Sequence, residues 1–152
     1  MGCIRPRRGV RSYFDRTQLP HLARATGEIL NFLGHDFDHS RHRYPNRDPG
    51  DIAWMQKLGA EGNWTIITGD ERIRRNPGER AVWQATGLTT FFLQGTWMAA
   101  PAEEQAWRLI RGLLRLIETV ESERPGTGLS LPMKWHAGRL LRLYSHGSTP
   151  IG

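Results

Sequence analysis

A short apolar run in the middle of the chain, Trp64 to Thr68 (WTIIT), constrains the fold more than any other feature. Five consecutive residues without a charged side chain are typical of a β-strand that is buried on both faces. Such strands belong to parallel sheets, because the crossover connections between parallel strands place helices on both sides. The run therefore predicts an α/β domain with a central strand at 64–68.

The segments around this run alternate between strand and helix patterns. The predicted strands are 10–15, 35–40 and 88–93, and the predicted helices are 19–34, 49–62, 76–87 and 101–123. In the last helix we expect one buried side made of Trp107, Ile110, Leu113, Leu114, Ile117 and Val120. The alternation predicts an α/β fold with three layers, an α/β/α sandwich around a central, largely parallel sheet.

The length of 152 residues suits a single domain. We expect a basic N-terminal arm at 1–9, the main domain at 10–124, and a C-terminal tail or closing hairpin packed on the same domain at 125–152, with short runs at MKWHAG and RLLRLY. No stretch has the length of a membrane span, and no apolar segment typical of a secretory signal follows the first basic residues. These features predict a soluble, cytoplasmic protein, in which Cys3 is given no role.

Positive charge is concentrated in arginine. The chain has 21 basic and 15 acidic residues, a net charge of +6, and 19 of the basic residues are Arg. The planar guanidinium group binds phosphate through two parallel hydrogen bonds, which favours a nucleic-acid partner. The alternative is that this composition reflects only solubility and loose binding to polyanions.

Aspartates follow two of the predicted strands. Asp15 ends the strand at 10–15, and Asp70 follows the strand at 64–68, so both belong at the carboxyl edge of the sheet, where ligands bind in such folds. Converging carboxylates repel each other unless a cation lies between them, and Mg²⁺ or Mn²⁺ would suit oxygen ligands and phosphodiester hydrolysis. The alternative is that each aspartate only begins a turn. For Asp51 the alternative is stronger, because Asp48-Pro49-Gly50-Asp51 resembles a helix-capping sequence.

Arginines lie next to these carboxylates in the sequence. Arg16 follows Asp15, and Arg72, Arg74 and Arg75 follow Asp70, which predicts phosphate-binding groups beside a metal site. A solvated loop of mixed charge is the alternative. The histidines of HDFDHSRHR do not resemble a zinc site, and we expect them to face solvent or RNA. Trp54, Trp83 and Trp107 are core or interface candidates, and an exposed Trp could stack on a base.

Three segments together resemble a known arrangement: YFDRTQLP, GDIAWMQKLGAEGNWTIITGDERIRRNPGE and LTTFFLQG. Their order is similar to that of PIN-like domains, as found in VapC-type toxins of bacterial toxin-antitoxin pairs. The resemblance covers roughly residues 10 to 95 and implies a PIN-like α/β/α fold. It also implies that Asp15, Asp51 and Asp70 are the catalytic, metal-binding acids. Many such domains use a fourth acid, for which Glu71 and Glu79 are candidates.

The resemblance implies a metal-dependent endoribonuclease that hydrolyses RNA. The expected cofactor is Mg²⁺ or Mn²⁺, and the expected partners are RNA and a cognate antitoxin protein, with a homodimer left open and no membrane involved. Arg16, Arg72, Arg74 and Arg75 would then bind the RNA backbone. The alternatives are a catalytically inactive PIN-like module that binds nucleic acid and a regulatory protein with a basic interaction surface.

Overall fold

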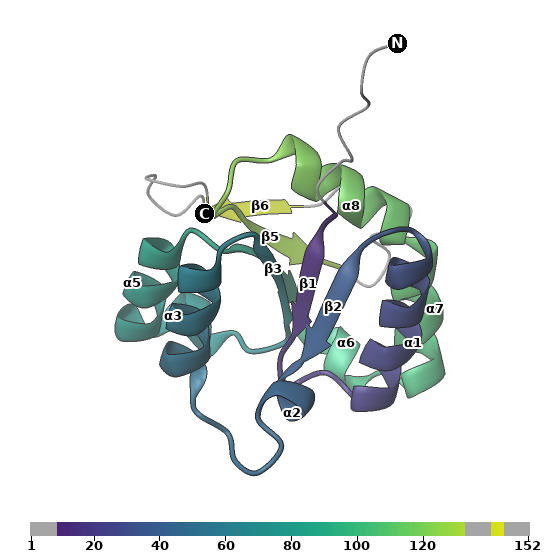
Figure 1. The fold of residues 1–152 in the computed structure, drawn as a ribbon, viewed down its shortest axis with the longest axis horizontal. Helices are drawn as coiled ribbons and strands as arrows, with labels where there is room; N and C mark the ends of the chain where they lie inside the picture. Colours follow the sequence, from purple (N-terminus) through teal and green to yellow (C-terminus); the bar gives the residue numbers. More distant parts are fainter. Residues whose placement is uncertain (1–8, 133–140, 145–152) are drawn as a thin grey trace.

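The computed structural model describes residues 9–132 and the backbone of 141–144. Six strands form one sheet in the order β2-β1-β3-β4-β5-β6, in which β1 to β5 are parallel and β6 pairs antiparallel with β5 (Figure 1). The strands are β1 (Arg11–Phe14), β2 (Asp36–His39), β3 (Trp64–Thr68), β4 (Thr89–Leu93), β5 (Gly128–Leu131) and β6 (Leu141–Tyr144). The predicted α/β class with a largely parallel sheet is confirmed.

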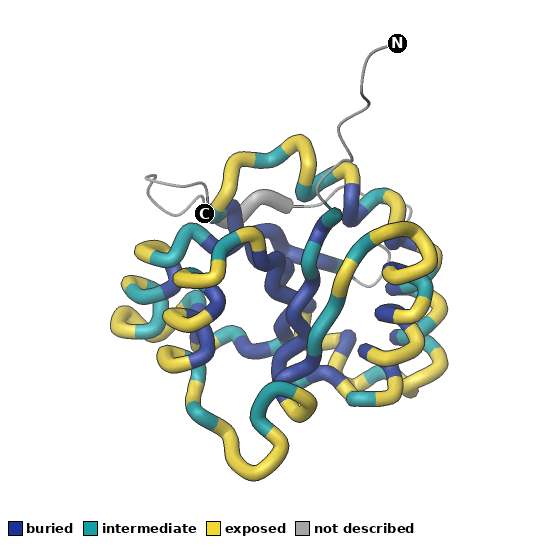
Figure 2. Tube along the Cα trace, viewed as in Figure 1, coloured by how far each residue is buried: buried dark blue, intermediate teal, exposed yellow. Residues whose placement is uncertain are grey.

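Helices cover both faces of this sheet. They are α1 (Pro20–Phe32), α2 (Ser40–Arg43), α3 (Asp51–Glu61), α4 (Arg72–Arg75), α5 (Pro77–Thr86), α6 (Gly95–Ala99), α7 (Ala102–Arg111) and α8 (Leu113–Ser122). In Figure 1, α3 and α5 lie on one side of the sheet, and α1, α7 and α8 lie on the other. Figure 2 shows the buried sheet between helices whose outer sides are exposed.

Two hydrophobic cores separate the layers, because successive residues of a strand point to opposite faces. Phe14 and Ile67 pack with α1, α7 and α8, whereas their neighbours Tyr13 and Ile66 pack with α3 and α5. All four side chains are at most 1% exposed. This double burial explains why the strand at 64–68 has no polar face.

The strand register sets the position of the functional edge. Phe14 of β1 pairs with His39 of β2 on one side and with Ile67 of β3 on the other. Because these strands are parallel, their carboxyl ends lie next to one another. Residues that follow β1, β2 and β3 are therefore brought together at one edge, as the predicted site requires.

The predicted single helix at 101–123 is wrong, because the chain forms two helices with Gly112 between them. Glycine is unfavourable inside a helix, and here the Gly112 amide bonds to carbonyls of the last turn of α7. The break turns the buried face, so that Leu109 and Leu116 are buried, whereas Trp107 is 42% and Leu114 is 64% exposed. The predicted buried side was thus partly wrong.

The loop after β2 is more ordered than the sequence predicts. Its first residues form the single-turn helix α2, in which Arg43 binds both Asp38 and Glu61. His39 is buried instead of facing solvent, and its Nε2 lies 2.9 Å from the carbonyl oxygen of Gln18. The short helices α4 and α6 were also not predicted, because one turn of helix leaves too little periodicity to detect.

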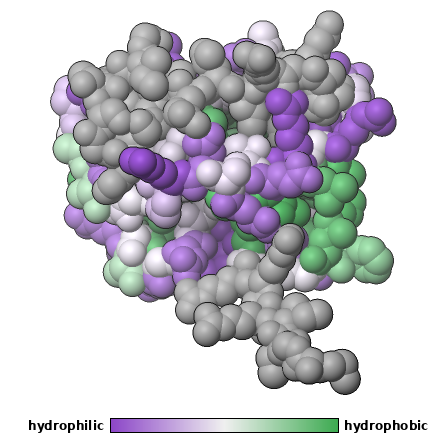
Figure 3. Space-filling view, turned by 90° about the horizontal axis from the view of Figure 1, so that it is seen from above, coloured by the Kyte–Doolittle hydropathy of each residue, from purple (hydrophilic) through white to green (hydrophobic). Residues whose placement is uncertain are grey.

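The chain after residue 125 contributes two strands, since β5 extends the parallel sheet and β6 pairs with it. The run MKWHAG and nearly all of the predicted N-terminal arm lie outside the described residues. None of the described helices is long and apolar enough to cross a membrane. Figure 3 views the edge where the parallel strands begin, and hydrophilic side chains cover much of its described surface, with a hydrophobic area along one side.

Candidate active site

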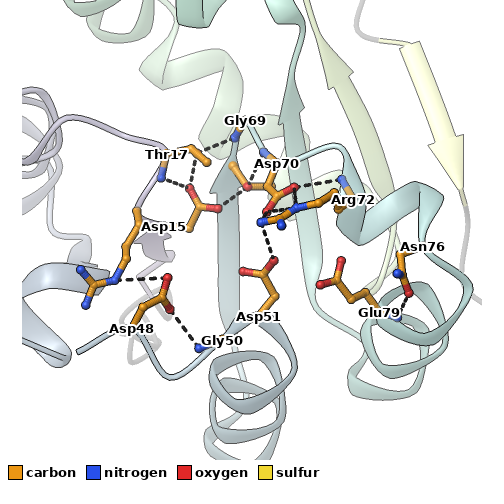
Figure 4. Close-up of polar contacts among 12 residues, drawn as sticks. Asp15, Thr17, Asp48, Gly50, Asp51, Gly69, Asp70, Arg72, Asn76 and Glu79 are labelled. Carbon is orange, nitrogen blue, oxygen red and sulfur yellow. Dashed lines mark hydrogen bonds and ion pairs between the residues drawn. The ribbon is translucent and has the colours of Figure 1, made fainter.

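A cavity of about 160 Å³ lies at the carboxyl edge of β1 and β3. Asp15 enters it from the end of β1, Asp51 from the first residue of α3, and Asp70 from the turn after β3. The three carboxylates come from separate segments of the chain and line one space (Figure 4). The structure therefore brings together the three acids that the sequence singled out.

Asp15 is fixed by hydroxyl groups on both of its carboxylate oxygens. The Thr17 hydroxyl and the Thr17 amide, at 3.0 Å, donate to Oδ1, while the Thr68 hydroxyl donates to Oδ2. Each threonine hydroxyl also accepts a hydrogen bond from a backbone amide. The Gly69 amide donates to Thr17 at 2.8 Å, and the Asp70 amide donates to Thr68 at 2.9 Å. Asp15 thus does begin a turn, as the alternative predicted, but it is also tied to the chain around Asp70.

Asp51 does not act as a helix cap. The N-cap of α3 is Gly50, whose φ of +88° favours glycine, and no side chain caps this helix. Asp48 instead accepts the Gly50 amide at 2.9 Å. The Asp51 carboxylate accepts the indole N–H of Trp54 at 2.9 Å, and Trp54 itself is 2% exposed. The predicted capping hydrogen bond of Asp51 is therefore absent, although its charge does lie in the first turn of α3, and a buried core residue orients its carboxylate.

Asp70 is held by Arg72. Its Oδ1 accepts the Arg72 amide at 2.9 Å and Nε at 3.0 Å, and its Oδ2 accepts Nη2 at 2.8 Å. The same Nη2 lies 3.9 Å from Asp51 (Figure 4). The Arg72 side chain is 76% exposed, so the guanidinium group covers the acidic cavity from the solvent side.

The three carboxyl groups differ in how readily they ionise. Burial raises the pKa of Asp15 to about 6, although the hydroxyl donors act against this. Burial also raises the pKa of Asp51 to about 7, with a further increase from its hydrogen bond with Asp70. For Asp70, burial would raise the pKa, but the hydrogen bonds from Arg72 outweigh it and lower the pKa. Ionising all three groups at neutral pH is thus costly without additional positive charge.

The donor chemistry of this cavity fits a divalent cation. Three carboxylates supply the oxygen ligands that Mg²⁺ and Mn²⁺ prefer, and two of them ionise reluctantly in the absence of a cation. Across the described ranges, however, no three His, Cys, Asp or Glu side chains are already arranged as a ligand cluster. Arg72 lies against Asp70 and provides part of the positive charge that an ion would provide.

The four predicted phosphate-binding arginines separate into two pairs. Arg16 and Arg72 line the cavity, although Arg16 also donates to the carbonyl oxygen of Tyr44 at 2.7 Å. Arg74 and Arg75 pair with Glu71, and neither is among the lining residues. The basic run next to the site is therefore partly neutralised by its own acidic residue.

The two candidates for a fourth acid, Glu71 and Glu79, differ in whether neighbouring residues already bind their carboxylates. Glu71 is occupied by its arginines, whereas the Oε2 atom of Glu79 is buried and has no hydrogen-bond partner among the described residues. The charge of Glu79 also raises the pKa of Asp51, after the stronger effects of burial and of Asp70. Figure 4 shows Glu79 beside the acidic cavity, at the start of α5.

Sequence reasoning missed Thr17, Thr68 and the role of Trp54. Both threonines lie two residues from a predicted acid, one after Asp15 and one before Asp70, and this spacing was the available signal. Gly69, between Thr68 and Asp70, also carried information, because a Cβ there would lie 2.7 Å from the Met98 sulfur and 3.3 Å from the Thr17 hydroxyl.

Comparisons with known proteins identify the family of this chain. Searches among curated proteins and among solved structures gave no match. A family comparison matched the PIN-like domain over residues 11–95, which is more than half of the chain and spans β1 to β4 with all three acids. This is a fold of the nuclease type, and the chain belongs to the PIN-like domain family.

Proposed function

We propose that this PIN-like domain is a divalent-metal-dependent ribonuclease that hydrolyses RNA phosphodiester bonds. The observation that carries the proposal is the convergence of Asp15, Asp51 and Asp70 on one cavity at the carboxyl edge of the parallel sheet. Each comes from a different segment, so local turn chemistry alone does not account for their meeting. Two of the three have a raised pKa, which is typical of groups at functional sites.

In this proposal Asp15, Asp51 and Asp70 hold Mg²⁺ or Mn²⁺. Such an ion would lower the pKa of a water molecule and offset the charge of the reacting phosphate. The threonine hydroxyls keep Asp15 in place, and the Trp54 indole keeps Asp51 in place. Fixed ligands of this kind are needed, because small displacements at a reacting centre reduce the rate strongly.

The arginines have two roles in the proposal. Arg72 and Arg16, which line the cavity, bind the phosphate that is cut, and Arg72 leaves Asp70 to do so. Arg74 and Arg75, which lie beside the cavity on α4, bind flanking phosphates. A guanidinium group that is mostly exposed, as in Arg72, can make this movement without disturbing the core.

The direct test is cleavage of a labelled single-stranded RNA by the purified chain, with Mn²⁺ and with EDTA. We expect cleavage only with the metal, and we expect Asp51→Asn and Asp70→Asn to abolish it. Asp36→Asn is the matched control, because this exposed aspartate lies at the start of β2, at the opposite edge of the sheet. Metal-independent cleavage, or full activity in both site variants, would contradict the proposal.

An inactive module that binds nucleic acid is the competing function, and the same assay separates the two. It would bind RNA through its arginines without cutting it, and the Asp variants would bind at least as well as the original chain. RNA binding that survives these substitutions, with no cleavage in Mn²⁺, would favour this competing function.

We further propose that the chain is the toxin of a toxin-antitoxin pair, on the basis of its resemblance to VapC-type sequences. The cognate antitoxin would place a cationic side chain in the acidic cavity, where Arg72 already shows that a guanidinium group fits. Expression in bacteria should then slow growth, and Asp70→Asn should remove this effect. Harmless expression of the unaltered chain would contradict the toxin role and leave the nuclease proposal to the cleavage assay.

A further inference from the structure

A second cavity, of about 350 Å³, lies between α1 and the segment formed by β2 and α2. The cavity is lined by Arg24 of α1, by Phe37, Asp38 and His39 of β2, and by Arg41 and His42 of α2. We call this cavity the basic groove. Figure 1 shows α2 close to the start of α1, at the same edge of the sheet as the carboxyl ends of β1 and β2.

The charges in the basic groove differ from those around the acidic cavity. Arg24 and Arg41 are exposed, and neither side chain forms a hydrogen bond or an ion pair with any residue that the structure describes. By contrast, Arg72 binds Asp70 and Arg43 binds Asp38. The basic groove therefore presents two guanidinium groups whose donors are not taken up by neighbouring carboxylates.

Close packing and hydrogen bonds hold the side chains at the base of the basic groove in place. Phe37 packs directly against α1 at Gly27, where a Cβ would lie 2.3 Å from the aromatic ring. The His39 ring is buried, receives the Arg41 amide at Nδ1 and contacts the Gln18 carbonyl oxygen through Nε2. The carboxylate of Asp38, which also lines the groove, is paired with Arg43 of α2. Burial lowers the pKa of His39, so the unpaired positive charge of the groove comes from Arg24 and Arg41.

The groove and the acidic cavity are neighbours along two stretches of the chain. Asp15 to Thr17 line the acidic cavity, and Pro20, three residues later, lines the groove. Ser40 lines the acidic cavity, while His39 and Arg41 on either side of it line the groove. A ligand that extends beyond the acidic cavity on this side therefore meets Arg24 and Arg41.

We propose that the basic groove binds the backbone of single-stranded RNA next to the phosphodiester that is positioned in the acidic cavity, with Arg24 and Arg41 as phosphate ligands. The inference rests on the proposed nuclease function and adds the path of the substrate. The volume of the groove is in the range of cavities for small molecules and suits one nucleotide rather than a duplex. Arginine forks are suited to phosphate because they bind it through two hydrogen bonds.

The experiment measures binding of fluorescently labelled oligouridylates of about 3 and about 12 nucleotides by anisotropy in EDTA, over a series of salt concentrations. The variant is Arg24→Ala/Arg41→Ala, and the control is Arg111→Ala, which removes an exposed helical arginine outside both cavities. For the longer oligomer we expect the double variant to reduce the slope of log Kd against log salt by about 1.4, since each phosphate contact on a single strand contributes about 0.7. For the shorter oligomer the slope should fall by much less. The control Arg111→Ala should give the same slope as the unaltered chain.

Two results would contradict the proposal that RNA binds in the basic groove. One is an unchanged salt slope for the longer oligomer in the double variant. The other is a fall of about 0.7 in the slope for Arg111→Ala, half of that expected for the double variant, which would mean that only the overall charge matters. The nuclease proposal is judged separately, by cleavage in Mn²⁺, so a chain that binds through Arg24 and Arg41 without cutting RNA would refute the catalytic function and support the binding path.

Discussion

Replacing Asp15 by Asn should stabilise the metal-free protein, and the gain should grow with pH. Asp15 is 3% exposed, and burial raises its pKa from 3.8 to about 6. The folded protein thus holds this proton more tightly than the unfolded chain, so the free energy of unfolding falls as pH rises from about 4 to about 6. At about 1.4 kcal/mol per pH unit, the full cost of ionising Asp15 is about 3 kcal/mol.

The amide of Asn cannot ionise, so Asp15→Asn avoids this cost above pH 6. It can accept with only one oxygen, however, whereas both Asp15 oxygens now accept threonine hydroxyls, and a lost hydrogen bond costs about 1 kcal/mol at every pH. The net gain at pH 8 is therefore about 2 kcal/mol. Roughly half of the pH-dependent part should appear between pH 5 and pH 8.

Urea unfolding in EDTA at these two pH values measures the difference between the variant and the unaltered chain. Asp36→Asn serves as the control, because this exposed aspartate is distant from the acidic cavity. If the free energies of unfolding of Asp15→Asn and the unaltered chain differ by the same amount at pH 5 and pH 8, ionisation of Asp15 does not cost stability and the reasoning is refuted. Adding Mn²⁺ at pH 8 gives a second readout, since an ion that binds only the folded state should stabilise the unaltered chain and not Asp15→Asn.

Further substitutions test the other parts of the site. If Arg72 competes with the ion for Asp70, Arg72→Ala should tighten Mn²⁺ binding in calorimetry by up to about fivefold, because a solvent-exposed ion pair contributes up to about 1 kcal/mol. Weaker Mn²⁺ binding would contradict this competition. Trp54→Phe keeps an aromatic ring in the core but removes the hydrogen bond to Asp51, so kcat should fall about tenfold or more with little change in KM, and unchanged kcat would deny the indole a positioning role. Replacing Arg72, Arg74 and Arg75 together by Ala should reduce the salt slope of RNA binding by about 2, and a slope that stays the same would place the RNA elsewhere.

Local sequence signals predicted the elements that depend on local contacts. The helix α5 begins as expected, because Asn76 accepts the amides of Gly78 and Glu79 and Pro77 occupies the first turn. The strand β3 was equally clear, since burial on both faces leaves no polar position within it. The break at Gly112 was not predicted, because the apolar periodicity continues through it and outweighed a single glycine.

The start of α3 shows why a capping sequence does not always produce a capping hydrogen bond. Asp48-Pro49-Gly50-Asp51 has nearly the same pattern as the start of α5, yet Asp51 turns toward the cavity and bonds to Trp54 instead of a backbone amide. The partner that decides this is a core residue held by tertiary packing, which the four residues do not encode. The contact between Arg72 and Asp70 was missed for a related reason, since a sequence of mixed charge does not reveal which carboxylate an arginine will reach.

The hydrogen bond between Trp54 and Asp51 also gives the molecule an optical probe at its acidic cavity. The emission of an indole responds to charge near its ring, and this indole donates directly to a carboxylate whose pKa is raised to about 7. Proton loss or cation binding at Asp51 should therefore change the emission of Trp54, and the difference spectrum between the unaltered chain and Trp54→Phe isolates that signal from the other five tryptophans. Occupancy of the cavity could then be followed in real time, without a label and without any substrate.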